Sequence, residues 1–575
     1  MSGYVGKCVS VDLTRGSVVI EDTPKDLCDR YLGGRGIGVA LVAGDITRSP
    51  YDPAMPLVFA TGPLVGTATP TSGRMAVVSR SPLTGTVFDC SVGGRFGTQL
   101  KRAGFDFFTV TGRADDWSVL TIRDGTVMLE KAPALEGENL SGIARLVPKE
   151  DSYAAIGTAG ERLVRFASIV VDGHYNAGRG GLGAVMGAKR LKLIRVRGSG
   201  NIPVADPVGL EEARGDIMRL LRASPAVFGE FGLAEFGTAA LVDLIHARRM
   251  EPTENFRKTF FPNSSDYSGY RLKTRYGTKR AGCAGCPILC KKRGAGGEVM
   301  PEYETVSHFG ALNGCSDPAY IVEANRLCND LGLDTISAAS TLACHGEITG
   351  KCLQPSQILE WLPLIASRSG TGDELAEGSL RYAAARGRGD LSMTVKGLEL
   401  PAYDPRGAYG MALAYATSNR GGCHLRAYPV SHEILRKPVA TDRFSFEGKA
   451  RIIRIAEDMN AVVDSLTACK FVFFASSLEE YAKAVNAVTG GHHHVQSLLS
   501  IGEEIWKLER RLNESNGFTA RDDDLPRRFF TEEGSSGGAV RIPPIDRASF
   551  LAARERYYSI RGFDGHAGAA RKVSP

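Results

Sequence analysis

The chain has no apolar run long enough to span a bilayer, and its first residues, Met-Ser-Gly-Tyr-Val-Gly-Lys, lack the apolar region of a secretory signal peptide. We therefore expect a cytoplasmic protein with no membrane span. A strong charge of either sign is also missing, because 70 Lys and Arg against 64 Asp and Glu leave a net charge of only +6 over 575 residues. This mild excess argues against a nucleic-acid partner. The chain shows no short-period repeat.

A second Cys-x-x-Cys knuckle is absent as well, although the chain has twelve cysteines. In a reducing compartment these thiols are expected to bind metals rather than to form disulfides. The informative group is Cys283-Ala-Gly-Cys286-Pro-Ile-Leu-Cys290, with Cys469 far downstream. Three closely spaced thiolates and one remote thiolate are typical of a [4Fe–4S] cluster that joins two regions. The alternatives are a zinc site, which usually has two knuckles, a radical-SAM cluster, whose spacings run in the reverse order, and unrelated structural thiols.

The local pattern changes near residue 200. Because 575 residues are too many for one core, we expect several domains. Short β-type runs between glycine turns predict strands at 6–12, 18–22, 57–62, 76–79, 107–112 and 191–196. Helical periodicity then predicts helices at 207–221, 320–331, 355–368, 448–460, 478–489 and 502–512. We expect a loop at the three histidines 492–494 and a loop or arm over the surface at 513–541.

Three glycine-rich loops, 33–38, 93–97 and 178–187, each contain an arginine, namely Arg35, Arg95 and Arg179. Glycine lets backbone N–H groups converge on an anion, and arginine adds a two-pronged donor for phosphate. The first loop lacks the strand, turn and helix unit of a dinucleotide fingerprint. Any single loop is more simply a tight turn in a sheet. Three of them in one β-rich region favour a ligand with several phosphates, or more than one ligand.

Further segments are similar, in sequence and in order, to one known family. They are Leu32-Gly-Gly-Arg-Gly-Ile-Gly38, Pro70-Thr-Ser-Gly-Arg74, Ser81-Pro-Leu-Thr-Gly85, Val92-Gly-Gly94, Gly180-Gly-Leu-Gly-Ala-Val-Met-Gly-Ala-Lys189, Pro301-Glu-Tyr-Glu304, Asn329-Asp-Leu-Gly-Leu-Asp334-Thr-Ile-Ser337 and Arg420-Gly-Gly-Cys-His424-Leu-Arg426. Together with the cysteine pattern, they make the chain resemble the tungsten-dependent aldehyde:ferredoxin oxidoreductase family over essentially its whole length.

The resemblance implies an α+β fold with three domains. Residues 1–203 would form a β-rich N-terminal domain whose two sheets are the base for a bis-pterin cofactor. Residues 204–400 would form a helical domain with three cluster cysteines and the first pterin motif. Residues 401–575 would form a second helical domain with the second pterin motif and the fourth cysteine. The end of the chain, from Tyr557 to Asp564, resembles the family's closing segment.

The cofactor that the resemblance implies is a tungstopterin, with tungsten, or molybdenum in its place, bound by two pterin dithiolenes. A [4Fe–4S] cluster would lie beside one pterin on Cys283, Cys286, Cys290 and Cys469. Arg74 matches the family arginine between pterin and cluster. The resemblance also implies a Mg²⁺ ion that bridges the pterin phosphates, with the backbone of Ser91 in place of a family asparagine.

Two motifs of the family hold the pterin rings, and here they begin at Asn329 and Asp464. Asn329 stands where the family has aspartate, and Thr467 and Ala468 replace Gly-Leu in the second motif, so the fine geometry at the pterins is in doubt. The implied cofactor-binding residues are Arg74, Ser91, Gly93, Gly94, Arg179, Gly180, Gly181, Gly183, Asn329, Asp334 and Asp464.

Glu304 and His424 match the family residues that handle protons near the metal. A carboxylate can accept a proton while an imidazole polarises the carbonyl oxygen of an aldehyde. The alternatives are a glutamate in a structural ion pair and a buried histidine with satisfied nitrogens. Glu302 and His308 are nearby substitutes for the same roles.

The expected activity is oxidation of an aldehyde to a carboxylic acid, with electrons passing through the cluster to ferredoxin or a similar carrier. An aryl-CoA reductase subunit on the same scaffold and an electron-transfer protein without pterins are the alternatives. A homodimer and a complex with iron–sulfur or flavin subunits both stay open. Some family members bind a mononuclear iron through Glu-x-x-His motifs, but Arg326 follows Glu323 at that spacing, so we predict no such iron.

Overall fold

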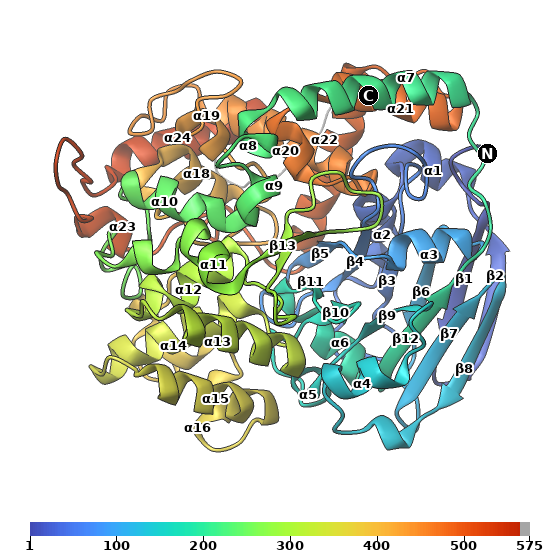
Figure 1. Ribbon diagram of the computed structural model, residues 1–575, viewed down its shortest axis with the longest axis horizontal. Coiled ribbons are helices and arrows are strands. Elements are labelled where there is room, and N and C mark those ends of the chain that lie inside the picture. Colours follow the sequence, from blue (N-terminus) through green and yellow to red (C-terminus); the bar gives the residue numbers. More distant parts are fainter. Residues whose placement is uncertain (564–575) are drawn as a thin grey trace.

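The computed structural model of the chain describes residues 1–563, and both of its large β-sheets lie in the N-terminal third (Figure 1). The first sheet has the strand order β2-β1-β6-β3-β4-β5. Its strands are β1 (Lys7–Asp12), β2 (Ser17–Asp22), β3 (Leu57–Ala60), β4 (Met75–Arg80), β5 (Val87–Val92) and β6 (Phe107–Thr111). β1 and β6 run parallel, whereas all other neighbours are antiparallel. β2 is an edge strand with mostly exposed side chains, and β3 and β4 are buried.

Glycines allow helix α2 (Gly34–Val42) to lie directly on this sheet. A Cβ atom at Gly38 would come within 2.4 Å of Val78 Cγ2 on β4. Arg35 is fully buried in the same helix, and its Nε lies 2.6 Å from Oε1 of Glu509. Residues 34–38 therefore form the first part of a closely packed helix, and their arginine serves a buried ion pair instead of a phosphate.

The second sheet has the order β11-β10-β9-β12-β7-β8. Its strands are β7 (Ser118–Arg123), β8 (Thr126–Lys131), β9 (Ser152–Ala155), β10 (Ile169–Val171), β11 (Tyr175–Ala177) and β12 (Leu191–Arg197). β12 pairs parallel with β7 and antiparallel with β9. The β-rich part also contains α1 (Lys25–Tyr31), α3 (Phe96–Arg102), α4 (Leu140–Leu146), α5 (Thr158–Glu161) and α6 (Leu182–Ala188).

The remaining chain is mainly helical, and its only strands among the described residues are two short pairs. The helices are α7 (Pro207–Ala223), α8 (Pro225–Phe228), α9 (Leu233–Phe236), α10 (Leu241–Ala247), α11 (Gly269–Tyr276), α12 (Tyr303–Phe309), α13 (Pro318–Leu331), α14 (Thr335–Thr349), α15 (Pro355–Ser367), α16 (Thr371–Leu375), α17 (Ser379–Ala384), α18 (Tyr409–Thr417), α19 (Val430–Glu433), α20 (Lys449–Ser465), α21 (Leu478–Thr489), α22 (Val495–Ser515), α23 (Arg528–Thr531) and α24 (Arg547–Arg561). The short strands are β13 (Lys279–Ala281), β14 (Lys291–Arg293), β15 (Thr394–Val395) and β16 (Leu398–Glu399).

Local capping signals explain where several helices begin and end. α21 begins after Ser477, which forms a capping box with Glu480, and ends at Gly490, whose left-handed conformation glycine adopts readily. Its bounds are those predicted from the sequence. α22 begins seven residues earlier than predicted, because the side chain of His494 accepts a hydrogen bond from the amide of Ser497 and caps the helix. The three histidines precede this helix as a loop.

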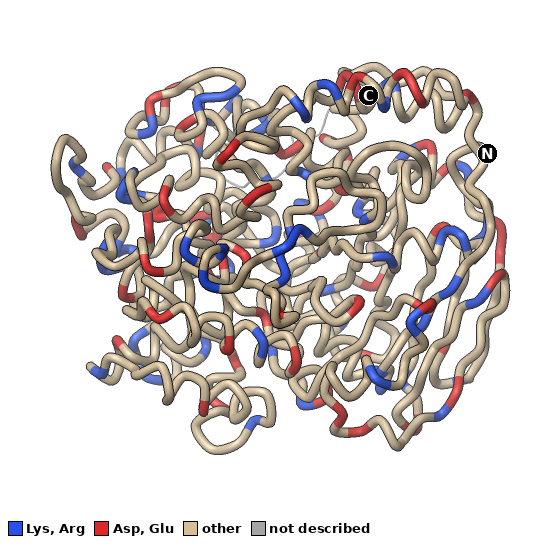
Figure 2. Tube along the Cα trace, in the orientation of Figure 1, with Lys and Arg blue, Asp and Glu red and all other residues tan. Residues whose placement is uncertain are grey.

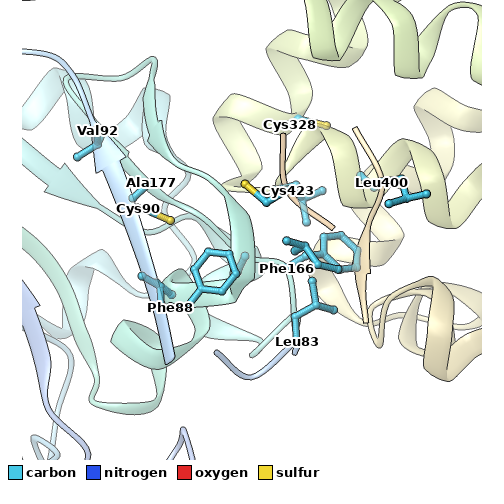
Figure 3. Packing of buried hydrophobic residues seen from close by; sticks show 14 of the residues in the cluster. Leu83, Phe88, Cys90, Val92, Phe166, Ala177, Cys328, Leu400 and Cys423 are labelled. Atoms are coloured by element: carbon cyan, nitrogen blue, oxygen red, sulfur yellow. The ribbon is translucent and has the colours of Figure 1, made fainter. Parts of the chain in front are cut away.

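One hydrophobic core continues from the sheets into the helices, so the two parts share an interface. Figure 3 shows Phe88 and Cys90 on β5 facing Cys423 and Leu400 from the helical part. This arrangement of two sheets followed by helices confirms the predicted fold class. The domain boundaries at 203 and 400 stay predictions, and residues from Asp564 onward, with the end of the third predicted domain, lie outside the described range. No helix within residues 1–563 is both long and apolar enough to cross a membrane.

Candidate functional site

A cavity of about 1460 Å³ lies between the β-rich part and the helical part. Its walls bring together residues that are up to about four hundred positions apart in the sequence. The predicted site residues that line it are Arg74, Ser91, Gly93, Arg179, Cys283, Cys286, Cys290, Asn329, Asp334, Glu304, His424, Asp464 and Cys469. The predicted residues Gly94, Gly180, Gly181 and Gly183 do not line it.

Three of the four cysteines lie on the loop between β13 and β14. The two strands pair antiparallel, so the loop projects as a hairpin whose thiols are half-buried. Cys469 follows α20 and donates its backbone N–H to the carbonyl oxygen of Thr71 at 3.0 Å. All four cysteines border the same cavity.

Within residues 1–563, no three His, Cys, Asp or Glu side chains converge closely enough to bind a single metal ion. A zinc ion would need its sulfurs about 2.3 Å away. Burial, together with the neighbouring Cys469, raises the pKa of the Cys286 thiol to about 11. Four thiols around a shared space fit a polynuclear cluster, whose irons can each take one of them, better than one zinc ion.

Gly93 leaves room beside Cys283, because a Cβ atom at this position would lie 2.4 Å from the Sγ atom. The φ angle of Gly93 is not in the left-handed region, so a substitution here acts through space alone. We expect Gly93→Ala to displace Cys283 and to lower the iron content below about four atoms per chain. Gly44→Ala is the matched control, since nothing lies within 4 Å of a Cβ atom there. Iron analysis of both purified variants checks this, and an unchanged iron content in Gly93→Ala would contradict it.

Arg74 is held beside the cysteines by two hydrogen bonds to one residue. Its Nε donates to Ser91 Oγ at 2.8 Å, and its Nη2 donates to the backbone oxygen of Ser91 at 2.6 Å. Burial opposes its charge, but the thiolates of Cys469 and Cys283 raise the pKa of Arg74 overall. The backbone oxygen of Ser91, which we expected to help hold Mg²⁺, is thus already an acceptor for Arg74.

Of the arginines in the three glycine loops, only Arg179 lines the cavity. Its Nη1 and Nη2 donate to the carbonyl oxygens of Gly422 and Glu399 at 3.0 and 2.6 Å, and its Nε lies 3.5 Å from Asp334. Arg95 instead donates to backbone oxygens of Lys149 and Asp151 at the surface. Only one of the three loops therefore places its arginine in the cavity wall.

The glycines after Arg179 allow close packing. A Cβ atom at Gly180 would lie 2.7 Å from the ring of Phe88, and one at Gly183 would lie 2.5 Å from the carbonyl oxygen of Ser168. Gly181 would meet the backbone of Arg165, and Gly94, at φ +98°, would meet Asp172. These glycines form the turns that position Arg179 and Gly93, and they do not face the cavity themselves.

The predicted pterin residues line the cavity, but each already has protein partners. Asn329 accepts from Asn176 Nδ2 at 2.8 Å and donates to a backbone oxygen of α13. Asp334 caps α14 by accepting from the amides of Ile336 and Ser337. The two carboxylate oxygens of Asp464 accept from Lys470 Nζ at 2.5 and 2.6 Å.

Glu304 and His424, the residues predicted to handle protons, lie side by side in the cavity wall. Oε1 of Glu304, at the N-terminal turn of α12, is 3.6 Å from Nε2 of His424. Oε2 accepts from the amide of Ala402 at 2.9 Å. Burial raises the pKa of Glu304 to about 8 despite that hydrogen bond, and burial together with Arg179 lowers the pKa of His424 well below its usual range. The pair therefore consists of a carboxyl group that titrates near pH 8 and an imidazole that stays neutral.

Glu302 and His308, the predicted substitutes, both interact with other groups of the protein. Glu302 pairs with Lys291 at 3.1 Å. Burial alone would raise the pKa of Glu302, but the Lys291 ammonium lowers it overall. His308 is fully buried, its nitrogens lie 2.6 and 3.2 Å from the carbonyl oxygens of Glu304 and Leu400, and burial lowers its pKa to about 4. Neither offers a free titrating group to the cavity.

Several polar atoms in this wall lack a hydrogen-bond partner within the described chain. They are Oε1 of Glu304, Nδ1 of His424, Nε of Arg179 and Oδ1 of Asn176. Buried polar groups are rarely left unpaired without a reason. Together with the space beside Gly93, they show that the cavity walls fit a large polar group.

Sequence reasoning did not identify other residues that line the cavity. Tyr403 and Tyr428 join their hydroxyl groups at 3.1 Å, and the ring of Tyr403 lies 5.6 Å from that of His424. Arg420 donates to the Sγ atom of Cys423 through Nη2 at 2.9 Å. Burial opposes ionisation of Cys423, but Arg420 lowers its pKa overall. In the sequence, the spacing Arg-x-x-Cys directly before His424 is the pattern from which the contact between Arg420 and Cys423 could have been predicted.

The Glu-x-x-Arg sequence on α13 forms an ion pair of its own. Arg326 Nη2 lies 2.6 Å from Oε1 of Glu323, and both side chains are about half exposed. The position that would carry a histidine in an iron motif is thus occupied by a surface cation.

Comparisons with known proteins show to which family the chain is related. The family model of the aldehyde ferredoxin oxidoreductase N-terminal domain matches residues 8–198, and the model of domains 2 and 3 matches residues 212–573. The tungsten-containing aldehyde ferredoxin oxidoreductase of Pyrococcus furiosus is 39% identical over 98% of this chain and 97% of that protein. The protein of the same name from Thermococcus kodakarensis is 38% identical with the same coverage.

A solved structure shares the fold at lower sequence identity. The active site complex BamBC of benzoyl coenzyme A reductase, in complex with 1,5 dienoyl-CoA, has a TM-score of 0.84 and 22% identity, covering 99% of this chain and 96% of that chain. This likeness concerns the fold alone. From the two family models and the nearly full-length relatives, we conclude that the chain belongs to the aldehyde ferredoxin oxidoreductase family.

Proposed function

We propose that this chain oxidises an aldehyde to the carboxylic acid at a tungsten or molybdenum bis-pterin centre and passes the electrons through a [4Fe–4S] cluster to ferredoxin or a similar carrier. One observation carries the proposal: Glu304 and His424 face the same cavity as the four cysteines and Arg74. An electron carrier without catalysis has no use for this pair. The named activity of the tungsten-containing relatives supports the same function.

The residues that would hold the cofactors follow from the cavity wall. Cys283, Cys286, Cys290 and Cys469 would bind the cluster, and Arg74 would lie between the cluster and a pterin. The pterins would contact Arg179, Asn329, Asp334 and Asp464, with Mg²⁺ near Ser91. When bound, the metal–pterin centre would supply the two-electron redox chemistry, and the cluster would carry the electrons out of the site one at a time.

The chain's own residues would then bind the aldehyde and move its protons. His424, kept neutral by burial and Arg179, donates a hydrogen bond to the aldehyde oxygen and polarises the carbonyl carbon. Glu304 accepts the proton released as water-derived oxygen adds to that carbon. Tyr403 and Tyr428 lie beside His424 in the cavity wall, where their rings would border the aldehyde. Overall, one aldehyde and one water give one acid, two protons and two electrons.

The raised pKa of Glu304 predicts a pH profile. A base is active only when deprotonated, so the rate should rise with pH and reach half of its plateau near pH 8. His424 stays neutral throughout this range, so its titration should not add a second inflection to the pH profile. Steady-state kcat/KM for an aldehyde, measured from pH 6 to 10 with a dye acceptor, checks this. A profile that is flat across pH 8 would rule out Glu304 as the base.

Metal analysis and a substrate panel test the proposed function. Anaerobically purified protein should contain about one W or Mo and about four Fe per chain. It should reduce a viologen dye with short or aromatic aldehydes. Dye-driven reduction of an aryl-CoA in place of aldehyde turnover would favour the reductase alternative. Iron without W or Mo and without either activity would leave an electron carrier, and zinc in place of iron would exclude the cluster.

A further inference from the structure

Positive charge is concentrated on the segment that holds three of the four cysteines. Residues 267–297 contain eight Lys and Arg and no Asp or Glu, in a chain whose net charge is only +6. The segment comprises α11, β13, the cysteine loop and β14. Figure 2 shows Lys and Arg gathered at the places where Figure 1 labels α11 and β13.

The register of the hairpin sets like charges opposite each other. Lys279 pairs with Arg293, and Arg280 pairs with Lys292. Like charges directly opposite in an antiparallel pair are destabilising. Two consecutive pairs of this kind lie at the base of the cysteine loop. They indicate that the charges interact with an external partner or with the group that the loop binds.

Only part of this charge is neutralised within the protein. Lys273 and Arg280 share the carboxylate of Glu235. Lys291 pairs with Glu302. Four further cations are exposed and form no ion pair with a carboxylate within the described part of the chain: Arg271, Arg275, Lys279 and Arg293.

Exposed aromatic rings border the same segment. Phe231 is 75% exposed and Tyr270, on α11, is 62% exposed. The ring of Phe231 stacks on Phe236 at 6.4 Å, and Phe236 in turn lies under the ammonium group of Lys273. Aromatic and arginine side chains are the groups that dominate protein–protein interfaces.

We propose that these residues form a docking face for a small, acidic iron–sulfur electron carrier of the ferredoxin kind. The docking face consists of Phe231, Tyr270, Arg271, Arg275, Lys279 and Arg293. Charge complementarity carries the assignment, because two of the uncompensated cations lie at the base of the loop from which an electron would leave and two lie on α11, the helix before it. The proposal rests on the proposed function, in which the cluster on that loop is the exit. Each carrier takes one electron at this face, so two carriers are reduced in succession for each aldehyde oxidised.

Charge reversal tests the docking face. In the double variant Lys279→Glu/Arg293→Glu, we expect the KM for a purified acidic ferredoxin to rise about tenfold or more at low salt, and its salt dependence to weaken. The KM and kcat for methyl viologen, a small cation, should stay within about twofold of the wild type. Arg271→Glu/Arg275→Glu, on α11 and outside the cysteine loop, should raise the ferredoxin KM in the same direction.

The matched control is Lys131→Glu/Arg145→Glu, which makes the same change in charge at exposed positions of β8 and α4. An equal rise of the ferredoxin KM in this control would show that net charge alone acts and would overturn the proposal. A parallel loss of iron and of viologen activity in Lys279→Glu/Arg293→Glu, with no effect in Arg271→Glu/Arg275→Glu, would assign the cations to cluster retention and would overturn it too.

A direct binding measurement separates this proposal from the proposed function. Ferredoxin immobilised on a sensor should bind the wild-type chain and the control, and should bind both docking-face variants much more weakly. If the wild type binds in this way but oxidises no aldehyde with a dye, the docking face stands and the proposed function fails. If the dye assay works and the docking-face variants bind ferredoxin as well as the wild type does, the docking face fails alone.

Discussion

Replacement of Glu304 by glutamine should lower kcat for aldehyde oxidation by about 10²- to 10⁴-fold, the range expected when a general base is removed. Glutamine keeps the shape of the side chain and can still accept from the amide of Ala402, which now donates to Oε2 at 2.9 Å. It cannot accept a proton from the reacting centre. Tungsten and iron contents should therefore stay at the wild-type values while turnover falls, and the pH dependence near pH 8 should disappear with it.

The matched control for this substitution is Glu302→Gln. Glu302 is two residues away but pairs with Lys291, and its pKa is lowered, so it is not a base poised for a proton. We expect this variant to keep kcat within about tenfold of the wild type, because an ion pair and not a proton transfer is lost. Kinetics and metal analysis of the two variants together decide between the carboxylates. A large loss in Glu302→Gln with little effect in Glu304→Gln would reverse the assignment.

The sequence predicted those parts of the fold and site that short patterns encode. α21 has its predicted bounds because Ser477, Glu480 and Gly490 are local capping signals. The short loop that holds Cys283, Cys286 and Cys290 follows from their spacing, although the strands β13 and β14 at its base were not predicted. These features depend on residues within a few positions of one another, so a single sequence contains all the information that they need.

Long-range ion pairs could not be predicted in this way. Arg35 was interpreted as an anion-binding residue, but it lies buried against Glu509, which is 474 positions away, and 3.5 Å from Asp464. The pair depends on α2 packing beneath α22, and the glycines that permit this packing have the same spacing as a phosphate loop. A glycine-rich sequence alone does not tell whether the free space receives a ligand or another part of the protein.

The opposed pKa shifts of Glu304 and His424 were equally outside the reach of the sequence. The resemblance placed both residues near the metal, but their states depend on burial by α12, by the turn at Ala402 and by the wall that holds Arg179. A carboxyl group that is hard to ionise and an imidazole that is hard to protonate favour a pair without net charge at rest. Once Glu304 has lost its proton, the pair can take up one proton without burying a net positive charge, which suits a desolvated site.

Removal of the remote cysteine should have an effect as large as that of Glu304→Gln but of a different kind. In Cys469→Ala the proposed cluster would lose the ligand that comes from outside the hairpin, so the iron content should fall well below about four atoms per chain. Aldehyde oxidation with ferredoxin should fall below about 1% of the wild type, because the electron exit is lost. Cys352→Ala is the control, since Cys352 is exposed and does not line the cavity.

The position of Cys469 makes this experiment a test of the architecture as well. Its backbone N–H donates to Thr71 in the β-rich part, and its thiol faces Arg74 and Cys283. The cluster would therefore bind the β13–β14 hairpin to the chain after α20, and metal binding to such a site contributes to folding stability. Cys469→Ala should lower the midpoint of thermal unfolding of the anaerobic protein, and a chelator that removes iron should lower the wild-type midpoint to the same value. Wild-type iron content in Cys469→Ala would show that the fourth ligand comes from elsewhere and would remove the link between the two segments.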